Sequence, residues 1–473
     1  ALIARVEQGV LVSEMEEGLD STPAYRKLAI QEVFPGRVGE TMTRTRKGRR
    51  APIDVPLDPT NINAADLNNG MQLGANPWSI EQYVFTLNEY ADTMDLNLMQ
   101  DQIAIADQFI ANARNNGVQA AQSLERICRK KLFGAYLSGN TRVITAPADA
   151  IVAPNATANA ATINAAAIGN QNVDDIRGFL TVLVNGKLEA PSVSNPLLIT
   201  ITQAATGLAI PCQIEAAAVA HGYETGKSAL DITTTPGAIP GQLQIRNNSG
   251  STYTMVVGDT IVANNAPAIF RPNARMNSAQ LVGGDTFTMS MVEDAVAYLR
   301  DNGVPPQDDG TYHCILDNTS MRQLYADPDF KHLYAGRDQS PEFKNLDIVR
   351  LAGVTFIPTT EAYVQNPFGG GAGPRIRRPI IAGAECIIQG NFEGMMTWLS
   401  QRGFDRTDSN IAMVEGVVQI VREPMDRLQQ SVAMSWNWIG DFAIPTDMTA
   451  TTTVIPTSSN ALYKRCVVIE HAG

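Results

Sequence analysis

Hydrophobic side chains recur at three- and four-residue steps between residues 115 and 137, with basic side chains between them. The apolar positions are Leu124, Ile127, Cys128, Leu132, Ala135 and Tyr136, and the basic positions are Arg126, Arg129 and Lys130. This spacing predicts one long amphipathic helix that ends near Gly139, because glycine suits a helix C-cap. Similar spacing predicts a separate helix over 95–112, followed by a break at Asn115-Asn116-Gly117.

Upstream of these helices, residues 38–46 and 78–87 resemble two strands. A tight turn is expected at Lys47-Gly48, and the chain is expected to continue extended over 51–57. Two strands cannot form a core by themselves, so this two-stranded excursion from the body is expected to pack on another surface of the chain or on another subunit. Residues 1–30 contain two short helical patches with little apolar surface to bury, which indicates an arm that lies on something else.

Downstream, charged residues become sparse between 141 and 285, and Ala, Asn and Thr dominate. The segment contains short apolar runs at 180–184, 197–201, 243–245, 253–257 and 268–270. These runs predict a small β-rich domain inserted between two parts of a host domain. A long decorated loop is the alternative, but unstructured loops of this length are rare.

Helices and strands alternate clearly from residue 286 onward. A helix is expected over 288–302 with Thr288 as its N-cap, and a short helix over 320–326. Strands are expected at 312–316, 354–357, 379–382, 385–388, 395–399, 413–422, 431–439 and 463–470. The fold class predicted from this pattern is α+β.

Length and charge narrow the possible functions. A chain of 473 residues is expected to form two to four domains. Its net charge of −12 argues against a protein that coats nucleic acid over its whole surface. No apolar run approaches the roughly 20 residues that span a bilayer, and the acidic first 20 residues do not resemble a signal peptide, so folding in a cytoplasm is expected.

A basic cluster lies at the end of the first predicted strand of the excursion. It consists of Arg44, Arg46, Lys47, Arg49 and Arg50. Phosphate binding is one interpretation, and a solvated tip that pairs with acidic groups of a neighbouring copy is the other. The second is favoured because no aromatic residue interleaves with the cluster and acidic residues flank it. The residues expected to contact a neighbouring copy are therefore this cluster together with Trp78, Tyr83 and Phe85.

Residues that could support catalysis or metal binding are scattered. The five cysteines and four histidines show no metal-ligand spacing, so neither a metal nor a cofactor is expected. The glycine-rich segment 369–373 lacks the Lys-Ser/Thr of a phosphate loop and is interpreted as a flexible loop. Asp92, Asp95 and Asp101 are interpreted as acids near a helix N-terminus rather than as a catalytic cluster. No catalytic residues are predicted, although a spatial triad cannot be read from sequence.

Several segments resemble major capsid proteins of tailed bacteriophages, and most closely the coat-protein family named after phage N-four. In the second half they are 312–330 (YHCILDNTSMRQLYADPDF), 351–364 (LAGVTFIPTTEAYV), 377–394 (RRPIIAGAECIIQGNFEG), 420–444 and 464–472. Segment 87–108 (LNEYADTMDLNLMQDQIAIADQ) resembles the same family's passage from its extended loop into its spine helix. The resemblance covers residues 30–140 and 285–473, whereas 141–285 is additional.

This resemblance implies the Hong Kong Ninety-seven type capsid fold. The implied parts are an N-terminal arm (1–30), an extended loop (31–90), a peripheral domain with the spine helix (91–140), a β-rich insertion domain (141–285), an axial domain (286–410), and closing strands of the axial and peripheral domains (411–473). Some relatives join subunits through a Lys–Asn isopeptide bond, but no motif here allows those residues to be assigned.

The implied function is that of a major capsid protein, which self-assembles as pentamers and hexamers into an icosahedral shell around double-stranded DNA. Further copies, a portal, a scaffolding protein and a decoration or cement protein are the expected partners. Packaged DNA is expected to make only non-specific contacts, no membrane contact is expected, and assembly would take place in the cytoplasm of the bacterial host. The alternatives are an encapsulin-like compartment shell, a decoration or tail component, a surface-layer subunit, and an enzyme.

Overall fold

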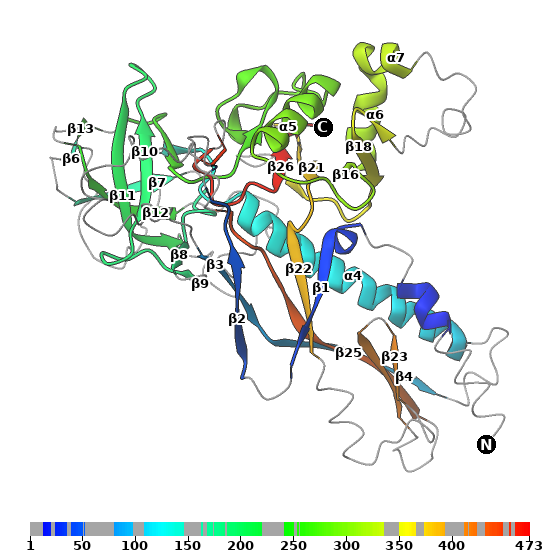
Figure 1. The fold of residues 1–473 in the computed structure, drawn as a ribbon. Coiled ribbons are helices and arrows are strands. Elements are labelled where there is room, and N and C mark those ends of the chain that lie inside the picture. Colours follow the sequence, from blue (N-terminus) through cyan, green and yellow to red (C-terminus); the bar gives the residue numbers. More distant parts are fainter. Residues whose placement is uncertain are drawn as a thin grey trace, which may run out of the picture.

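The computed structural model confirms an α+β fold in which one long helix crosses the middle of the molecule (Figure 1). It describes residues 13–19, 24–35, 39–50, 52, 80–97, 108–145, 162–163, 168–173, 175–184, 187–219, 241–249, 253–254, 256–334, 350–365, 373–392, 411–414, 416–422, 431–447, 454–455 and 459–473. The long helix is α4 (Gln108–Tyr136). Its 29 residues correspond to a rod of roughly 43 Å.

One face of α4 packs on a six-stranded sheet, which we call the long sheet. Its strands run in the order β1 (Ala29–Phe34), β22 (Ile387–Phe392), β25 (Ser431–Ala443), β24 (Val417–Arg422) and β23 (Ile411–Val414), and β4 (Asn88–Asn97) also pairs with β25. β1 and β22 are parallel, whereas the other pairs are antiparallel. The largest apolar core of the described residues lies where α4 meets this sheet.

A second six-stranded sheet, the upper sheet, lies above α4 in Figure 1. Its order is β15 (Ile269–Phe270), β26 (Cys466–Ile469), β21 (Ile380–Ala382), β16 (Tyr312–Leu316), β18 (Val354–Pro358) and β17 (Arg350–Leu351). Three helices accompany it: α5 (Met289–Asp301), α6 (Asn318–Ala326) and α7 (Pro328–Tyr334). A small sheet beside it contains β19 (Val364–Gln365), β20 (Ile376–Arg377) and β27 (His471–Ala472).

A closed six-stranded barrel lies to one side of α4. Its strands close in the order β10 (Leu197–Thr202), β11 (Ala209–Val219), β12 (Gly241–Asn247), β7 (Ile168–Val173), β5 (Arg142–Thr145) and β14 (Thr260–Ala263). Two strand pairs accompany the barrel: β6 (Thr162–Ile163) with β13 (Tyr253–Thr254), and β8 (Val182–Val184) with β9 (Lys187–Glu189). The barrel has its own apolar interior, formed by alternating side chains such as Ile199, Ile201 and Ile214.

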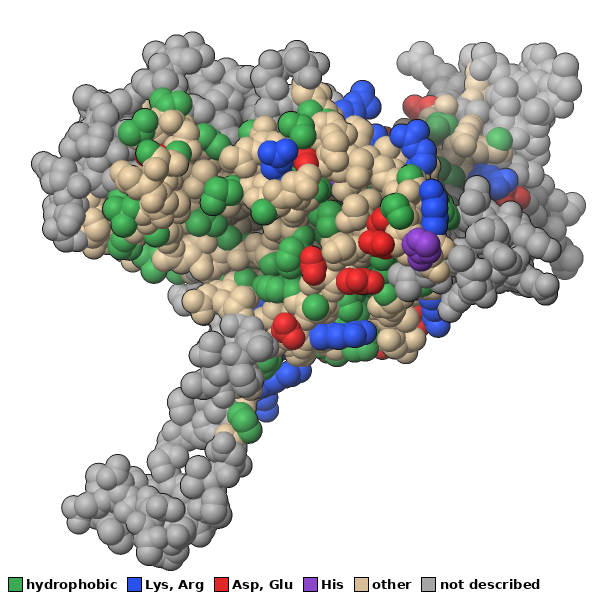
Figure 2. Space-filling model, turned by 90° about the horizontal axis from the view of Figure 1, so that it is seen from above, with side chains coloured by type: hydrophobic (Ala, Val, Ile, Leu, Met, Phe, Trp, Pro, Cys, Tyr) green, Lys and Arg blue, Asp and Glu red, His purple; other side chains and the backbone are tan. Residues whose placement is uncertain are grey.

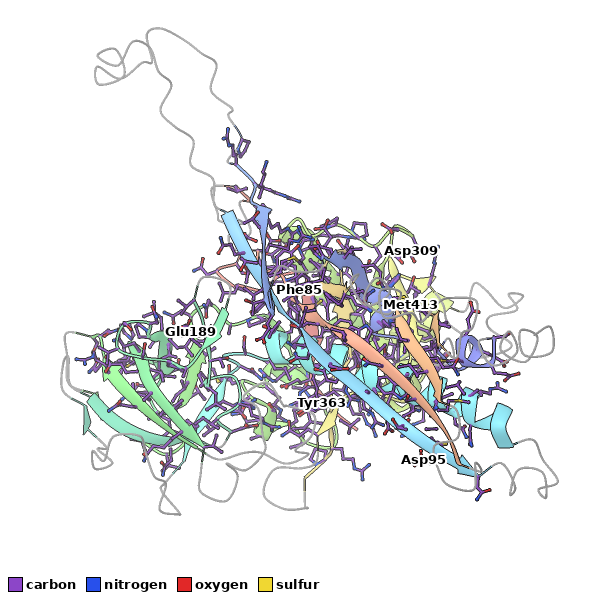
Figure 3. All side chains as sticks on the ribbon, turned by 90° about the horizontal axis from the view of Figure 1, so that it is seen from below. Phe85, Asp95, Glu189, Asp309, Tyr363 and Met413 are labelled. Atoms are coloured by element: carbon purple, nitrogen blue, oxygen red, sulfur yellow. The ribbon has the colours of Figure 1, made fainter. Side chains whose placement is uncertain are left out.

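The remaining strands, β2 (Thr41–Lys47) and β3 (Ile80–Thr86), form an antiparallel hairpin that extends from the body (Figure 3). Residues 13–19 form a short helix, and the described residues also contain the 3₁₀ helices η1 (Arg26–Leu28), η3 (Pro272–Ala274) and η4 (Ser278–Gln280). Among the described helices, none has the length and apolar character that crossing a membrane requires.

The structure corrects several boundaries predicted from sequence. Residues 95–97 belong to β4 rather than to a helix, so Asp92 and Asp95 lie on a strand and not at a helix N-terminus. α4 continues without a break through Asn115-Asn116-Gly117. Lys47 pairs with Ile80, so β2 and β3 are not joined by a tight turn at Lys47-Gly48.

Two further corrections concern strands. The predicted strand over 413–422 is divided between β23 and β24, which pair as a hairpin. Residues 269–270 form β15 of the upper sheet, so the barrel uses only 142–263 of the segment 141–285. The predictions for Asp101, for most of 51–57, for 369–372 and for 395–399 lie outside the described residues.

Candidate assembly surface

The root of the β2–β3 hairpin is anchored in the body by a small apolar cluster. Phe85 is fully buried there, together with Phe34, Met42 and Ile388. Its ring lies against the backbone of Gly390, where an added Cβ would be 3.0 Å from a ring carbon. Glycine is therefore the residue at this position that allows the ring to approach the sheet.

A hydrogen bond and an ion pair to one carboxylate connect the same root to α4. The backbone N–H of Thr86 donates to Asp441 Oδ2 at 3.0 Å, and the Lys131 ammonium group on α4 lies 2.9 Å from Asp441 Oδ1. The Asp441 side chain is only 2% exposed, so this ion pair is shielded on the carboxylate side. A movement of the hairpin root is thereby coupled to the long helix through one carboxylate.

Two aromatic residues predicted to contact a neighbouring copy are used within the subunit. Phe85 is 0% exposed and Tyr83 8% exposed, and their rings meet edge to face with centroids 5.6 Å apart. The Tyr83 hydroxyl donates to Glu32 Oε1 at 2.9 Å. Burial, together with this hydrogen bond, raises the pKa of Tyr83 to about 12. Trp78, the third aromatic residue, lies outside the described residues.

The basic cluster is partly neutralised by acidic groups of the same chain. Arg46 lies 2.6 Å from Glu385, and Arg44 lies 3.5 Å from Glu32. Arg49 donates to the carbonyl oxygen of Gly303 at 3.0 Å. The other two members, Lys47 and Arg50, are exposed. The cluster therefore attaches the hairpin to the body as well as presenting positive charge at its surface.

Glu385 is shared between the hairpin and the upper sheet. Its Oε2 lies 2.6 Å from Arg46 of β2 and 3.1 Å from Arg465, which precedes β26. Arg465 also lies 3.5 Å from Asp447. Burial raises the pKa of the Asp447 carboxyl above its usual range. This network of four charges connects β2 to the upper sheet.

The arm is held against α4 by a buried carboxylate. Glu125 is 1% exposed and accepts hydrogen bonds from three consecutive backbone N–H groups, those of Ala24 (2.8 Å), Tyr25 (2.6 Å) and Arg26 (3.1 Å). These groups precede or begin η1, so the carboxylate caps the start of that turn. Burial raises the pKa of Glu125, although the three N–H groups partly oppose this effect.

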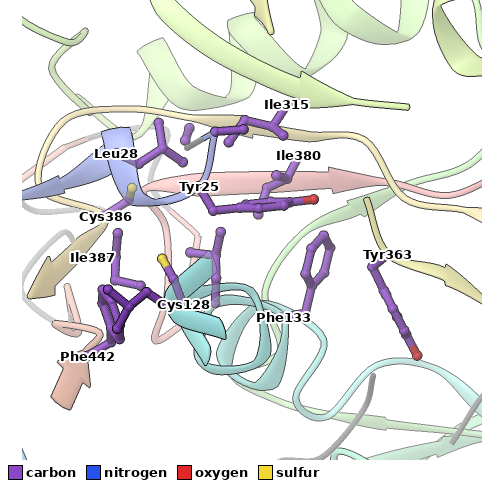
Figure 4. Close-up of a cluster of buried hydrophobic side chains, with 14 of the residues drawn as sticks. Tyr25, Leu28, Cys128, Phe133, Ile315, Tyr363, Ile380, Cys386, Ile387 and Phe442 are labelled. Carbon is purple, nitrogen blue, oxygen red and sulfur yellow. The ribbon is translucent and has the colours of Figure 1, made fainter. Parts of the chain in front are cut away.

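Aromatic packing closes over this arm contact (Figure 4). The Tyr25 ring meets Phe133 of α4 edge to face at 6.0 Å, and Phe133 in turn lies 5.3 Å from Tyr363. Residues 13–19 form a helix that crosses α4 where two glycines meet, Gly18 and Gly117. A Cβ on Gly117 would lie 2.5 Å from the Met15 carbonyl oxygen, so the two backbones are in direct contact.

The barrel presents a surface with few charges and several exposed apolar side chains. Figure 2 shows mostly hydrophobic and uncharged polar side chains on the described part of the barrel, whereas charged side chains gather over the rest of that face. Leu208, Val256 and Val257 are 58%, 58% and 61% exposed. They lie in two adjacent turns that are tied together by Asp259, which accepts from the N–H groups of Ala204 (2.9 Å) and Val256 (2.9 Å).

The described residues contain no group of three or more His, Cys, Asp or Glu side chains arranged to hold a metal ion. The five cysteines are free and buried. Burial raises the pKa of Cys314 and Cys128 well above the usual thiol range, so these thiols are held in their protonated form.

Comparison with known proteins gives matches among solved structures. No protein-family model matches the sequence, and no curated protein matches it either. The capsid of Ralstonia phage GP4 aligns over 94% of this chain and 87% of its own, at 10% identity and a TM-score of 0.46. The capsid of the cyanophage P-SCSP1u aligns over 96% and 89%, at 8% identity and a TM-score of 0.44.

A chain of the cyanophage Pam1 capsid aligns over 93% of this chain and 87% of its own, at 9% identity and a TM-score of 0.44. The fold of this chain resembles that of phage capsid proteins.

Sequence reasoning missed the residues that fasten the arm and the hairpin. Glu125 could have been found, because it occupies the apolar stripe of α4 between Ala121 and Cys128. An acid in such a stripe indicates a buried partner. Gly18 carries no comparable local signal, since its role depends on a helix that lies about 100 residues away.

Proposed function

We propose that this chain is the major capsid protein of a tailed bacteriophage, and that many copies assemble into a closed icosahedral shell around double-stranded DNA. The observation that carries the proposal is the β2–β3 hairpin. Its two strands pair only with each other among the described strands, and seven paired positions join them. A two-stranded ribbon is marginal in water, so contact with a neighbouring copy would stabilise it.

The attachments of the hairpin support this role. Asp441 connects its root to α4, and Glu385 connects it to the upper sheet. An arm that is clipped to α4 by Glu125 adds a second long-range connection within the subunit. A subunit braced in this way can transmit force from a neighbour's contact into its core. We infer a mechanical function in which self-association, and not turnover of a substrate, is the activity.

Packaged DNA would face the shell without sequence readout, consistent with the net charge of −12, which disfavours tight binding of a polyanion. Hexamers, pentamers, a portal, a scaffolding protein and a decoration protein are the partners we propose. The exposed apolar turns of the barrel are a surface suited to such contacts.

The proposal is tested by electron microscopy and light scattering of the purified chain. Shells, partial shells or rings are expected, with a scaffolding protein co-expressed if the chain alone stays dispersed. The sharpest variant replaces residues 48–79 by Asn-Gly, since the opposed pair Lys47 and Ile80 allows a two-residue turn. This variant should keep the circular dichroism and melting temperature of the subunit but lose assembly.

Normal assembly by the shortened variant would contradict the role of the hairpin. Particles from infected cells should protect DNA from nuclease, whereas protein cargo in its place would favour the encapsulin-like alternative. Dispersed protein that stays monomeric even with every candidate scaffolding protein would overturn the capsid proposal itself.

A further inference from the structure

A buried cluster of polar residues, here called the hub, lies where the end of α4, the barrel and the upper sheet meet. Its members are Asn140, Arg142, Asp175, Arg177, Arg271, Gln365, Arg378 and Glu470. Two arginines clamp Glu470 from opposite sides: Arg271 Nε lies 2.7 Å from Oε2, and Arg378 Nε lies 2.8 Å from Oε1. The Glu470 side chain is completely buried.

The clamp extends at both ends. Arg271 Nη2 donates to the Asn140 amide oxygen at 2.7 Å, and Arg378 Nη2 donates to the Gln365 amide oxygen at 2.6 Å. Burial alone would raise the pKa of the Glu470 carboxyl, but Arg271, Arg378 and Arg142 outweigh burial and hold it well below its usual range. Glu470 therefore stays ionised, and Arg142 acts on the same carboxylate through space.

Positive charge exceeds negative charge within the hub. Arg142 also lies 3.7 Å from Asp175, which forms a close ion pair with Arg177 at 2.6 Å. The hub thus holds four arginines and only two carboxylates, Asp175 and Glu470. Two uncompensated positive charges in a buried region are costly unless a negative charge accompanies them.

The unpartnered atoms of the hub are all hydrogen-bond donors. Four buried nitrogens have no hydrogen-bond partner: Asn140 Nδ2, Arg142 Nε, Gln365 Nε2 and Arg378 Nη1. The orientation of both amides is fixed, because an arginine can donate only to their oxygens. No oxygen of the hub is left without a partner.

The excess of positive charge distinguishes an anion from water as the missing partner. A water molecule could accept two of these N–H groups and donate to the second lone pairs of the hub oxygens, but it would leave the two excess positive charges uncompensated. An anion accepts from several donors and needs no acceptor, and it also supplies the missing negative charge.

We propose that a small inorganic anion, either chloride or a compact oxyanion such as phosphate, is bound in the hub and accepts hydrogen bonds from unpartnered N–H groups among those of Arg142, Arg378, Asn140 and Gln365. The anion joins the barrel to the upper sheet at the end of α4, as a structural ligand of each subunit. This inference does not depend on the capsid proposal, and both of its tests are made on the full-length subunit.

The first test measures release of the anion. The purified chain is passed by gel filtration into sodium gluconate, a salt whose anion is too large for the hub, and is then denatured with urea. Ion chromatography should detect about one equivalent of chloride or phosphate per chain, and the identity of the ion separates the two sources. Release of less than about a tenth of an equivalent, from protein that was first equilibrated with both ions, overturns the proposal.

The second test compares melting temperatures at constant ionic strength. A saturable rise of about 2 °C or more is expected on replacing gluconate by the bound anion. Gln365→Glu should abolish this rise and the release of anion, because it places a fixed negative charge beside Arg378 while still accepting its hydrogen bond. Asn140→Asp places a fixed negative charge beside Arg271 and should likewise abolish the rise and the release of anion. It replaces Gln365→Glu in the test if that variant fails to fold.

Gln82→Glu is the matched control, since it adds the same charge at an exposed position of β3, away from the hub. This control should keep the full dependence on the anion. Equal melting temperatures of the unaltered chain in all salts overturn the proposal. So does a folded Gln365→Glu or Asn140→Asp chain that still releases one equivalent of anion.

Discussion

At the scale of single residues, the most informative side chains are buried polar groups that join distant segments. Glu125 contacts backbone groups 99 to 101 positions away in the sequence. Gln389, which is also buried, accepts from Arg26 Nε at 3.3 Å on the other side of the same turn. These contacts act together with apolar packing, because Met15, Leu19, Tyr25 and Leu28 are buried in the largest core, contrary to the expectation that this segment has little apolar surface to bury.

Glu125→Gln is expected to loosen the arm. The amide keeps one acceptor oxygen in place of two and brings an NH₂ group toward three backbone donors, so the free energy of unfolding should fall by about 1–3 kcal/mol. Trypsin cleavage after Arg26 or Lys27 should become faster, and hydrogen exchange at residues 24–26 should rise. Glu293→Gln, at an exposed position of α5, is the control and should change neither rate.

His471 is expected to make the subunit sensitive to acid. Burial lowers its pKa to about 4 from the usual histidine value of 6.5, against the opposing influence of the Ala472 carbonyl and Asp317. Its ring stacks on Phe287 with centroids 5.3 Å apart, and Nε2 lies 2.7 Å from Ser320 Oγ. Because burial lowers the pKa of His471, the ring is neutral at pH 7.

As the pH falls, the His471 ring is protonated at a higher pH in the unfolded chain than in the folded chain. The contribution of the neutral ring to the free energy of unfolding is therefore complete above pH 6.5 and is lost as the pH falls toward 4. The loss is roughly 3 kcal/mol. The melting temperature should therefore drop between pH 7 and pH 5. His471→Gln should flatten this drop while keeping a hydrogen bond to Ser320. An unaltered chain with the same melting temperature at both pH values would refute the assignment.

At the scale of elements, Gly117 shows how a residue that normally weakens a helix can serve its packing. Gly117→Ala should favour the isolated helix by about 1 kcal/mol. Here the added Cβ would collide with the Met15 carbonyl oxygen, so the helix of residues 13–19 must move away from α4.

The expected result of Gly117→Ala is an unchanged helical signal from α4, together with faster hydrogen exchange and proteolysis of residues 13–19. Gly283→Ala provides the control, because a Cβ at that position meets nothing within 4 Å. Unchanged protection of residues 13–19 in the Gly117 variant would show that the crossing tolerates a side chain.

At the scale of the whole molecule, the barrel is a unit with its own core whose two ends lie side by side. The Ala263 N–H donates to the Gly139 carbonyl oxygen at 2.9 Å. The chain thus enters and leaves the barrel at one point, the geometry expected of an inserted domain.

Removal of residues 141–262, with a short glycine-serine linker between Asn140 and Ala263, should leave the rest of the chain folded. α4, the long sheet and the upper sheet keep their own cores in that variant. Circular dichroism should retain the helical signal, and unfolding should remain cooperative at a melting temperature a few degrees lower, because the hub loses part of its contacts. An insoluble or non-cooperative product would contradict independence of the two parts.

The sequence by itself determined the elements whose stability is local. The helices α4 and α5 could be predicted because each has one buried face with a 3.6-residue period. The strands β16 and β18 could be predicted because each is a short apolar run that is buried on both faces. The same patterns gave the α+β class. The expected two-stranded excursion matched β2 and β3 in position, although not in its turn.

Only the tertiary structure decided how distant segments combine. β4 is a strand because it pairs with β25 over ten positions more than 300 residues away, and this partner decides the conformation of residues 95–97, which were predicted to begin a helix. Phe85 and Tyr83 are internal because Gly390 and Glu32 provide places for them. The same holds for the contacts of Glu125 with residues 24–26, for the crossing of the helix of residues 13–19 at Gly117, and for the hub. Each joins segments that are distant in the sequence, and such contacts produce no periodic pattern within either segment.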